Sequence, residues 1–215
     1  RPTRVEHHSD LIRPTSGERS SGYSISKNAI SIRSKFCNLH IVDFENVESW
    51  APFLKGDVLF SSLGTTLKQA GSKNNQYLVD FTYQYRFAEE ASKNGVQAYV
   101  LVSAAGASAR SLIFYSRIKG ELDEKVRKLP FRTITVLRPS ILSGIREKRR
   151  TTEEWSLQLT EKLTKFIGKK YRPIPAATVA KAMINAALSD ERSKYSIVNL
   201  NDIFTLADRS TDFKN

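Results

Sequence analysis

Tyr115 and Lys119, a phenol and an ammonium four residues apart, are the pair in this chain whose types and spacing could do chemistry. Residues four apart lie on the same face of a helix. A lysine ammonium beside a phenol favours the phenolate, so the tyrosine proton becomes available to a carbonyl or an alkoxide near neutral pH. Because the same spacing arises by chance on solvated helices of Lys-rich chains, the surrounding elements must decide what the pair does.

From about residue 36 onward, short apolar runs alternate with stretches of helical spacing. Repeated β-α-β order predicts an α/β fold, a parallel sheet with helices on both faces. Ligands of such sheets bind beyond the carboxyl ends of the strands, where Asp43, Gly64, Ser103 and Pro139 fall. The predicted strands are 39–44, 57–63, 98–103, 133–138 and 195–198, and the predicted helices are 75–94, 112–129, 153–166 and 176–188.

The first 35 residues do not follow this pattern. They contain eight Ser, seven Lys or Arg and one aromatic residue, and no period of a helix or strand persists. This composition predicts an irregular Ser/Arg-rich arm over 1–35, the product of truncation or of a wrong reading frame, followed by one domain over 36–215.

Composition limits the function classes. The net charge of +12 is compatible with nucleic-acid binding. The basic residues are scattered, however, and the densest run, 146–150, has no interleaved aromatic residues, which makes nucleic acid a disfavoured partner. The chain has no apolar run of about 18 residues, so no membrane span is predicted. The single cysteine and the absence of a secretory signal predict a reducing, cytoplasmic location, and the three histidines do not form a metal set.

Between Ile41 and about Asn185 the chain resembles the atypical short-chain dehydrogenase/reductases, namely the TIP30-like group and its bacterial NAD(P)-binding homologues. Several short motifs carry this resemblance, in family order and with family spacing. They are Ile41–Phe44, Ser62–Thr66 with Ala70-Gly71, Val79-Asp80, Val102–Ala107, Phe114–Glu121 and Leu137–Pro139.

The resemblance implies a Rossmann-like, doubly wound sheet and hydride transfer between a nicotinamide dinucleotide and a small carbonyl or alcohol substrate. It favours NADP over NAD. Tyr115 would be the general acid/base, Lys119 would lower the pKa of that phenol and bind the nicotinamide ribose, and Ser103 would complete the catalytic set. The implied cofactor-binding residues are Asp43, Phe44, Leu63, Gly64, Thr65, Lys119, Pro139 and Ser140.

Each of these residues could instead have a purely structural role. Asp43 could cap a turn, Gly64 and Pro139 could simply end strands, and Asp80 is predicted to be a packing or helix-surface residue rather than a ligand. Trp155, Phe166 and Tyr171 could line a substrate pocket or pack in the core.

Two departures from the family leave catalysis open. The family begins with a strand and a G-x-x-G-x-x-G turn that holds the pyrophosphate, whereas Gly17 and Gly22 here are isolated. Ala104 also replaces the second Ser of the family pair, for which Ser108 or Ser111 could substitute. A non-catalytic nucleotide-binding or regulatory protein on the same fold is therefore the alternative, and a basic nucleic-acid or surface binder is a third possibility.

Overall fold

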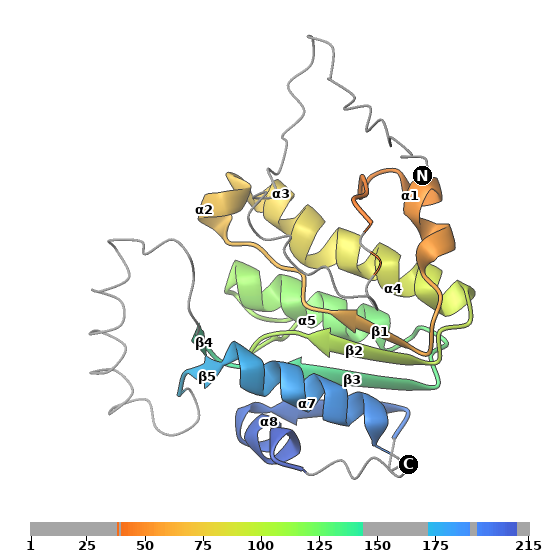
Figure 1. The fold of residues 1–215 in the computed structure, drawn as a ribbon. Coiled ribbons are helices and arrows are strands. Elements are labelled where there is room, and N and C mark those ends of the chain that lie inside the picture. The colour runs from red at the N-terminus through yellow and green to blue at the C-terminus, as the bar shows by residue number, and fades with distance from the viewer. Residues whose placement is uncertain (1–37, 39, 144–171, 190–192, 210–215) are drawn as a thin grey trace, which may run out of the picture. The chain divides into compact units, whose positions relative to one another are not determined.

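A computed structural model describes residues 38, 40–143, 172–189 and 193–209. The chain divides into two units, Arg1–Ile41 and Val42–Asn215, and every helix and strand named below belongs to the second (Figure 1). The predictions for the arm 1–35, for the basic run 146–150 and for the helix 153–166 lie outside the described residues, as do those for Trp155, Phe166 and Tyr171.

Four parallel strands form the central sheet, in the order β1-β2-β3-β6. In the register of the three strand pairs, Tyr99 lies between Leu59 and Ile134, and Ile134 in turn lies beside Tyr195. Parallel neighbours require long crossovers, which the helices supply. The strands are β1 (Val58–Ser61), β2 (Ala98–Val102), β3 (Thr133–Arg138) and β6 (Tyr195–Asn199), with a separate parallel pair of β4 (Leu142–Ser143) and β5 (Ile174–Pro175).

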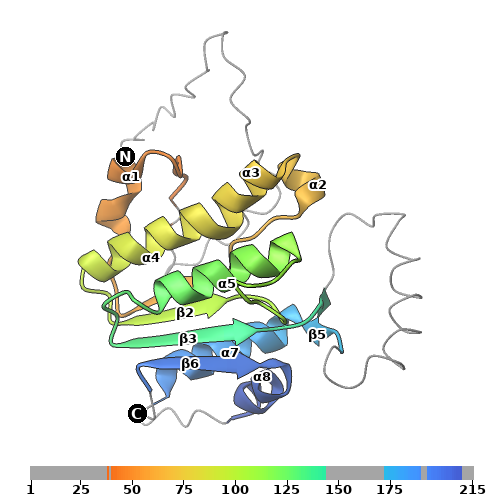
Figure 2. The ribbon, with the colours of Figure 1, turned by 180° about the vertical axis from the view of Figure 1, so that it is seen from behind.

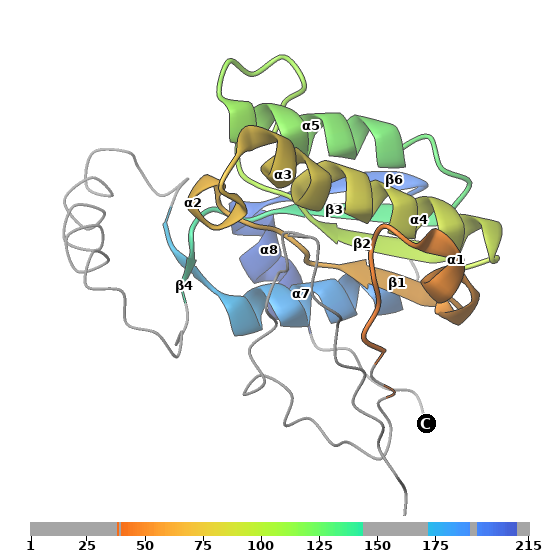
Figure 3. The same cartoon turned by 90° about the horizontal axis from the view of Figure 1, so that it is seen from above.

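Helices cover both faces of this sheet, as Figures 2 and 3 show. One face carries α3 (Lys73–Tyr77), a π-helical turn (Leu78–Tyr83), α4 (Gln84–Lys93) and α5 (Phe114–Val126), and the other carries α7 (Ala176–Leu188) and α8 (Leu200–Ala207). The predicted Rossmann-like, doubly wound α/β fold is thereby confirmed. The remaining short helices are α1 (Val47–Trp50), η2 (Ala51–Phe53) and α2 (Leu67–Ala70).

The strand β2 shows that the sheet is buried on both faces. Its alternate side chains enter two different cores: Tyr99 and Leu101 pack with α4 and α5, while Val100 packs with α7 and α8. A strand that is covered on both faces reads as a continuous apolar run, which is the pattern from which it was predicted. No helix among the described residues combines the length and the apolar character that a membrane span needs.

The predicted helix 75–94 is interrupted by the π-helical turn Leu78–Tyr83. Ser72 caps the start of α3 by accepting a hydrogen bond from the Asn75 amide. Within the wide turn two consecutive residues, Val79 and Asp80, are both buried. Turns of this kind are rare and occur often at functional sites.

The predicted strand 39–44 is wrong, because its described residues form no strand. The Asp43 carbonyl accepts a hydrogen bond from the Asn46 amide, and the Asp43 carboxylate accepts one from the Glu45 amide. These local bonds turn the backbone into α1, so the apolar pattern of Ile41 and Val42 is not used in a sheet.

Candidate active site

The turn that follows β1 is held by a buried carboxylate. The Thr65 amide donates a hydrogen bond to Asp80 Oδ2 over 3.1 Å. A β-carbon built on Gly64 would lie 3.1 Å from Asp80 Oδ1, closer than ordinary van der Waals contact. Glycine therefore leaves room for Asp80 to approach the backbone of this turn, so two predicted cofactor residues share one contact that the sequence did not indicate.

Lys119 reaches the same carboxylate from α5. Its Nζ lies 3.7 Å from Asp80 Oδ1, and the two side chains are 2% and 0% exposed. Asp80 is therefore no surface residue. One signal in the sequence could have indicated this. Asp80 lies between the apolar Val79 and Phe81 inside a helical pattern, and burying a carboxylate is costly unless a cation lies near it.

A second ion pair, whose carboxylate is buried, lies next to this one. Asp123, one helical turn after Lys119, accepts hydrogen bonds from Nε and Nη2 of Arg138 at 3.0 and 2.8 Å. The buried Ser103 hydroxyl makes no well-formed hydrogen bond to described residues, yet it faces the Asp123 carboxyl and favours its ionised form. Asp80, Lys119, Asp123 and Arg138 thus form a row of alternating charges, which we call the buried charge row.

Burial governs the titration of this row. Burial raises the pKa of the Asp80 carboxyl, and the charge of Lys119 and the Thr65 amide oppose that rise. Burial lowers the pKa of the Lys119 ammonium, against the attraction of Asp80 and Asp123. The pKa of the Asp123 carboxyl is also raised by burial, with Ser103 and Arg138 acting in the other direction. In each case the loss of hydration outweighs the partner.

Tyr115 departs from the prediction made for it. Partial burial, together with the nearby Asp80 carboxylate, raises the pKa of its phenol to about 12. Burial is the larger cause of this rise, and the negative charge of Asp80 adds to it. A lowering of this pKa by Lys119 stays a prediction, since the positive charge of Lys119 is paired with Asp80 in the protein without a ligand.

The structure places the remaining predicted catalytic-loop residues as follows. Ala104 is buried, so no hydroxyl replaces the missing Ser at that point. The Ser108 and Ser111 hydroxyls accept hydrogen bonds from the backbone amides of Arg110 and Ile113. Both candidate substitutes therefore shape their own loop.

The predicted cofactor residues fall into two groups. Pro139 lies beyond the end of β3, where its carbonyl accepts from the Ala105 amide, and the Ser140 hydroxyl donates to the Arg172 carbonyl. Asp43 and Phe44 instead adjoin the far end of the π-helical turn, since the Phe44 ring stacks on Tyr83 at 5.2 Å. The turn-capping alternative for Asp43 is what its side chain does here. A cofactor role for these residues stays a prediction.

Gly120 fixes α5 against the loop that precedes it. A β-carbon at Gly120 would lie 2.2 Å from the Ser108 carbonyl carbon and 2.3 Å from the Ala109 nitrogen. The Ser108 amide donates to the Ser116 carbonyl over 3.0 Å. This close approach sets the start of the helix that carries Tyr115 and Lys119.

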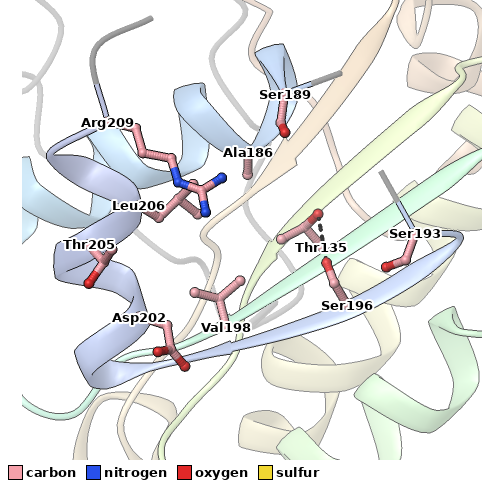
Figure 4. A pocket seen from close by; sticks show the side chains of 10 residues that line it. All are labelled: Thr135, Ala186, Ser189, Ser193, Ser196, Val198, Asp202, Thr205, Leu206 and Arg209. Atoms are coloured by element: carbon pink, nitrogen blue, oxygen red, sulfur yellow. Dashed lines mark hydrogen bonds between the residues drawn. The ribbon is translucent and has the colours of Figure 1, made fainter. Parts of the chain in front are cut away.

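A separate cavity of about 310 Å³ lies between β3, β6, α7 and α8 (Figure 4). Its wall is rich in hydroxyl groups, and Thr135 and Ser196 hydrogen-bond to each other there at 3.2 Å. None of the predicted site residues lines it. Its walls are Thr135, Ala186, Ser189, Ser193, Ser196, Val198, Asp202, Thr205, Leu206 and Arg209.

We expect the free energy of unfolding of Asp123→Asn to depend less on pH in the acidic range than that of wild type. The pKa of Asp123 is higher in the folded chain than its ordinary 3.8, so its stabilising contribution is full below that value and is lost as the pH rises. Wild type should therefore lose stability relative to Asp123→Asn between about pH 4 and pH 7. Urea unfolding across this range measures the difference, with the exposed Asp57→Asn as control. A difference that instead favours wild type as the pH rises would show that Arg138 outweighs burial.

The parallel sheet with helices on both faces defines a Rossmann-like α/β protein. No family model matches the chain. Curated relatives do match, among them FMP52 of Eremothecium gossypii and rat HTATIP2. The FMP52 protein is 33% identical over 174 residues, covering 75% of each chain. Rat HTATIP2 is 35% identical over 153 residues, covering 71% of this chain and 62% of that protein. The chain belongs to the family of the FMP52 and HTATIP2 proteins.

Solved structures show the same fold. MoeE5 in complex with UDP-glucuronic acid and NAD has a TM-score of 0.56 at 14% identity, covering 74% of this chain and 61% of that one. RMD from Pseudomonas aeruginosa complexed with NADPH has a TM-score of 0.55 at 13% identity, covering 74% and 66%. The chain thus spans about two thirds of the length of these proteins.

The predicted cytoplasmic location is contradicted. The FMP52 relatives from Eremothecium gossypii and Candida albicans, 33% and 32% identical, are named mitochondrial. A single cysteine argues against an oxidising compartment, but it does not separate the reducing compartments from one another.

Proposed function

We propose that the chain is an NAD(P)-dependent oxidoreductase that interconverts a small carbonyl compound and an alcohol, with Tyr115 as the general acid/base. The observation that carries this proposal is the meeting of Lys119, Asp80 and the Gly64-Thr65 turn beyond the carboxyl ends of the strands. The solved structures of MoeE5 and RMD are complexes with NAD and NADPH, which supports a nicotinamide dinucleotide. We propose NADP over NAD because of the positive net charge and the family resemblance, and a mitochondrial location by analogy with the FMP52 relatives.

The residues at the carboxyl end of the sheet fit the nicotinamide-ribose half of such a cofactor. Gly64 is exposed, so its backbone can be approached from solvent, and Lys119 Nζ lies 3.7 Å from Asp80, which leaves its hydrogen-bond donors for a ligand. Leu63, Thr65, Pro139 and Ser140 would complete this half. A Gly-rich turn for the pyrophosphate is not found among the described residues. When bound, the cofactor would supply hydride transfer.

The chain itself supplies the proton and its placement. Tyr115 is 40% exposed, so its phenol can meet a substrate oxygen, and its raised pKa keeps it in the acid form at neutral pH. That form is the one required to protonate a carbonyl oxygen during reduction. Ser103 and Lys119 lie deeper and would orient the reacting groups.

A second function is favoured by two observations. Ala104 is buried where the resemblance implies a hydroxyl, and burial together with Asp80 raises the pKa of Tyr115. Losing one such hydrogen-bond donor costs on the order of 100-fold to 1000-fold in rate. A nucleotide-binding or regulatory protein that does not turn over substrate would be consistent with both.

A thermal unfolding scan with and without NADPH or NADH tests the proposal. Binding to the folded state at about 100 times Kd adds roughly 2.7 kcal/mol to the unfolding free energy. For a chain of this length we expect Tm to rise by about 5–10 °C with NADPH and by less with NADH. A cooperative transition that responds to neither dinucleotide would contradict both candidate functions.

A further inference from the structure

We propose that Asp80 is a positioning residue that couples the Gly64-Thr65 turn to Lys119, so that a change at the turn is transmitted to the lysine through this one carboxylate. The significance of the coupling for catalysis rests on the proposed function. The coupling itself is a property of the chain and can be measured without any cofactor.

The two oxygens of Asp80 serve different elements. Oδ2 accepts the Thr65 amide at 3.1 Å, which fixes the carboxylate relative to the turn. Oδ1 accepts no hydrogen bond from the residues that the structure describes, and Lys119 Nζ lies 3.7 Å from it. Charge-assisted hydrogen bonds are about 2.7–2.9 Å long. The separation of 3.7 Å is longer, so Asp80 attracts the Lys119 ammonium but leaves it free to shift. The same Oδ1 is the atom that a side chain at position 64 would touch.

Among the described residues, Asp80 is the carboxylate that forms an ion pair with Lys119, while Asp123 acts on the ammonium without forming one. The charged and titratable groups around the ammonium are Asp80 from the π-helical turn, Asp123 and Tyr115 from α5, and Arg138 from β3 on the far side of Asp123. Arg138 already donates two hydrogen bonds to Asp123. Asp80 is therefore the counter-ion that holds Lys119 in its charged form, and its carboxylate also acts on Tyr115.

Neutralising Asp80 should change both members of the Tyr115–Lys119 pair. A buried ammonium that loses its counter-ion gives up its proton at a lower pH. The phenol of Tyr115 loses a repulsive charge and ionises more readily. A residue with only a structural role would lower stability without moving these protonation equilibria.

The first test is a thermodynamic cycle on the full chain without ligand. Gly64→Ala displaces Asp80 Oδ1, and Lys119→Met removes the ammonium with little change in volume. Changes at independent sites add, whereas coupled ones do not. We expect the Tm shifts of these two variants to be non-additive by about 2 °C or more, and additive when Asp80→Asn is also present.

Asp80→Asn is the sharpest single variant, because its amide oxygen can still accept the Thr65 amide while the charge is lost. If Asp80→Asn unfolds but Asp80→Asn/Lys119→Met folds, the rescue is the expected coupling. Additive shifts of Gly64→Ala and Lys119→Met in the wild-type background would overturn the inference.

The second test is the pH dependence of NADPH affinity. We expect Asp80→Asn to weaken NADPH at least tenfold near neutral pH and to move the pH at which affinity changes downward by one unit or more, on the order of the shifts that a lost counter-ion produces. Glu89→Gln is the matched control, since it removes one negative charge from the exposed side of α4 and should leave the profile unchanged. A profile of Asp80→Asn that coincides with wild type would contradict the inference. Failure of wild type to bind NADPH would instead count against the proposed function, and the cycle would then decide the coupling alone.

Discussion

Tyr115→Phe is expected to lower the turnover of carbonyl substrate by about 100-fold to 10,000-fold, the range contributed by a positioned general acid. The substitution removes one oxygen and keeps the ring, so the packing of this side chain at the start of α5 is preserved. The phenol is the exposed titratable group of the site, and its pKa of about 12 means that it carries the proton that reduction requires. The measurement is steady-state oxidation of NADPH with a panel of small carbonyl compounds, combined with NADPH affinity by fluorescence titration.

Affinity should stay within about twofold of wild type, because the lost group acts on the substrate oxygen rather than on the cofactor. Tyr85→Phe is the matched control, since the Tyr85 hydroxyl lies on α4, away from the candidate site, and donates a hydrogen bond to Glu89. Turnover that survives in Tyr115→Phe would assign the proton to another group. Tight NADPH binding by a wild-type chain that shows no turnover would favour the regulatory protein instead.

Gly120→Ala is expected to destabilise the chain by about 2–3 kcal/mol, which corresponds to a fall in Tm of roughly 5–10 °C. Alanine normally favours a helix interior over glycine by about 1 kcal/mol. Here the new β-carbon would meet the backbone of Ser108 and Ala109 at 2.2–2.4 Å, and backbone cannot yield as a flexible side chain can. The steric cost should therefore exceed the gain in helix propensity.

Urea unfolding of Gly120→Ala measures this cost, and Glu124→Ala provides the control. Glu124 is exposed on the same helix, so its replacement should change stability by no more than about 0.5 kcal/mol. An unchanged or raised stability in Gly120→Ala would show that the loop before α5 is less tightly packed than the structure indicates. Since that loop positions the start of α5, the variant should also lose any activity that Tyr115 supports.

Much of the fold could be predicted because its strands and helices follow strong local patterns. The strand 133–138 and the helix 176–188 coincide with β3 and α7. The predicted strand 39–44 failed because hydrogen bonds to Asp43, a short-range effect, override the apolar pattern of its described residues. The π-helical turn was missed because its residues keep an ordinary helical spacing in the sequence.

The candidate site was less predictable than the fold. Tyr115, Lys119, Gly64 and Thr65 could be chosen because motifs mark them. The partners of Lys119 could not, since Asp80 is 39 positions away in the chain and only tertiary packing shows that both are buried. Asp123 offered one local signal, its spacing of four from Lys119, but the same spacing is common on solvated helices. The rise in the pKa of Tyr115 comes from burial first and from Asp80 second, and both depend on tertiary packing that the sequence does not show.

The buried charge row also determines how the site responds to the surrounding solution. Dissolved ions screen charges that solvent can reach, as in the pair of Lys93 and Glu90, where the lysine is 59% exposed. Asp80, Lys119 and Asp123 are each no more than 2% exposed, so counter-ions cannot come between them. Ionic strength will therefore alter the outer surface of this strongly basic chain while the electrostatics behind Tyr115 stay the same.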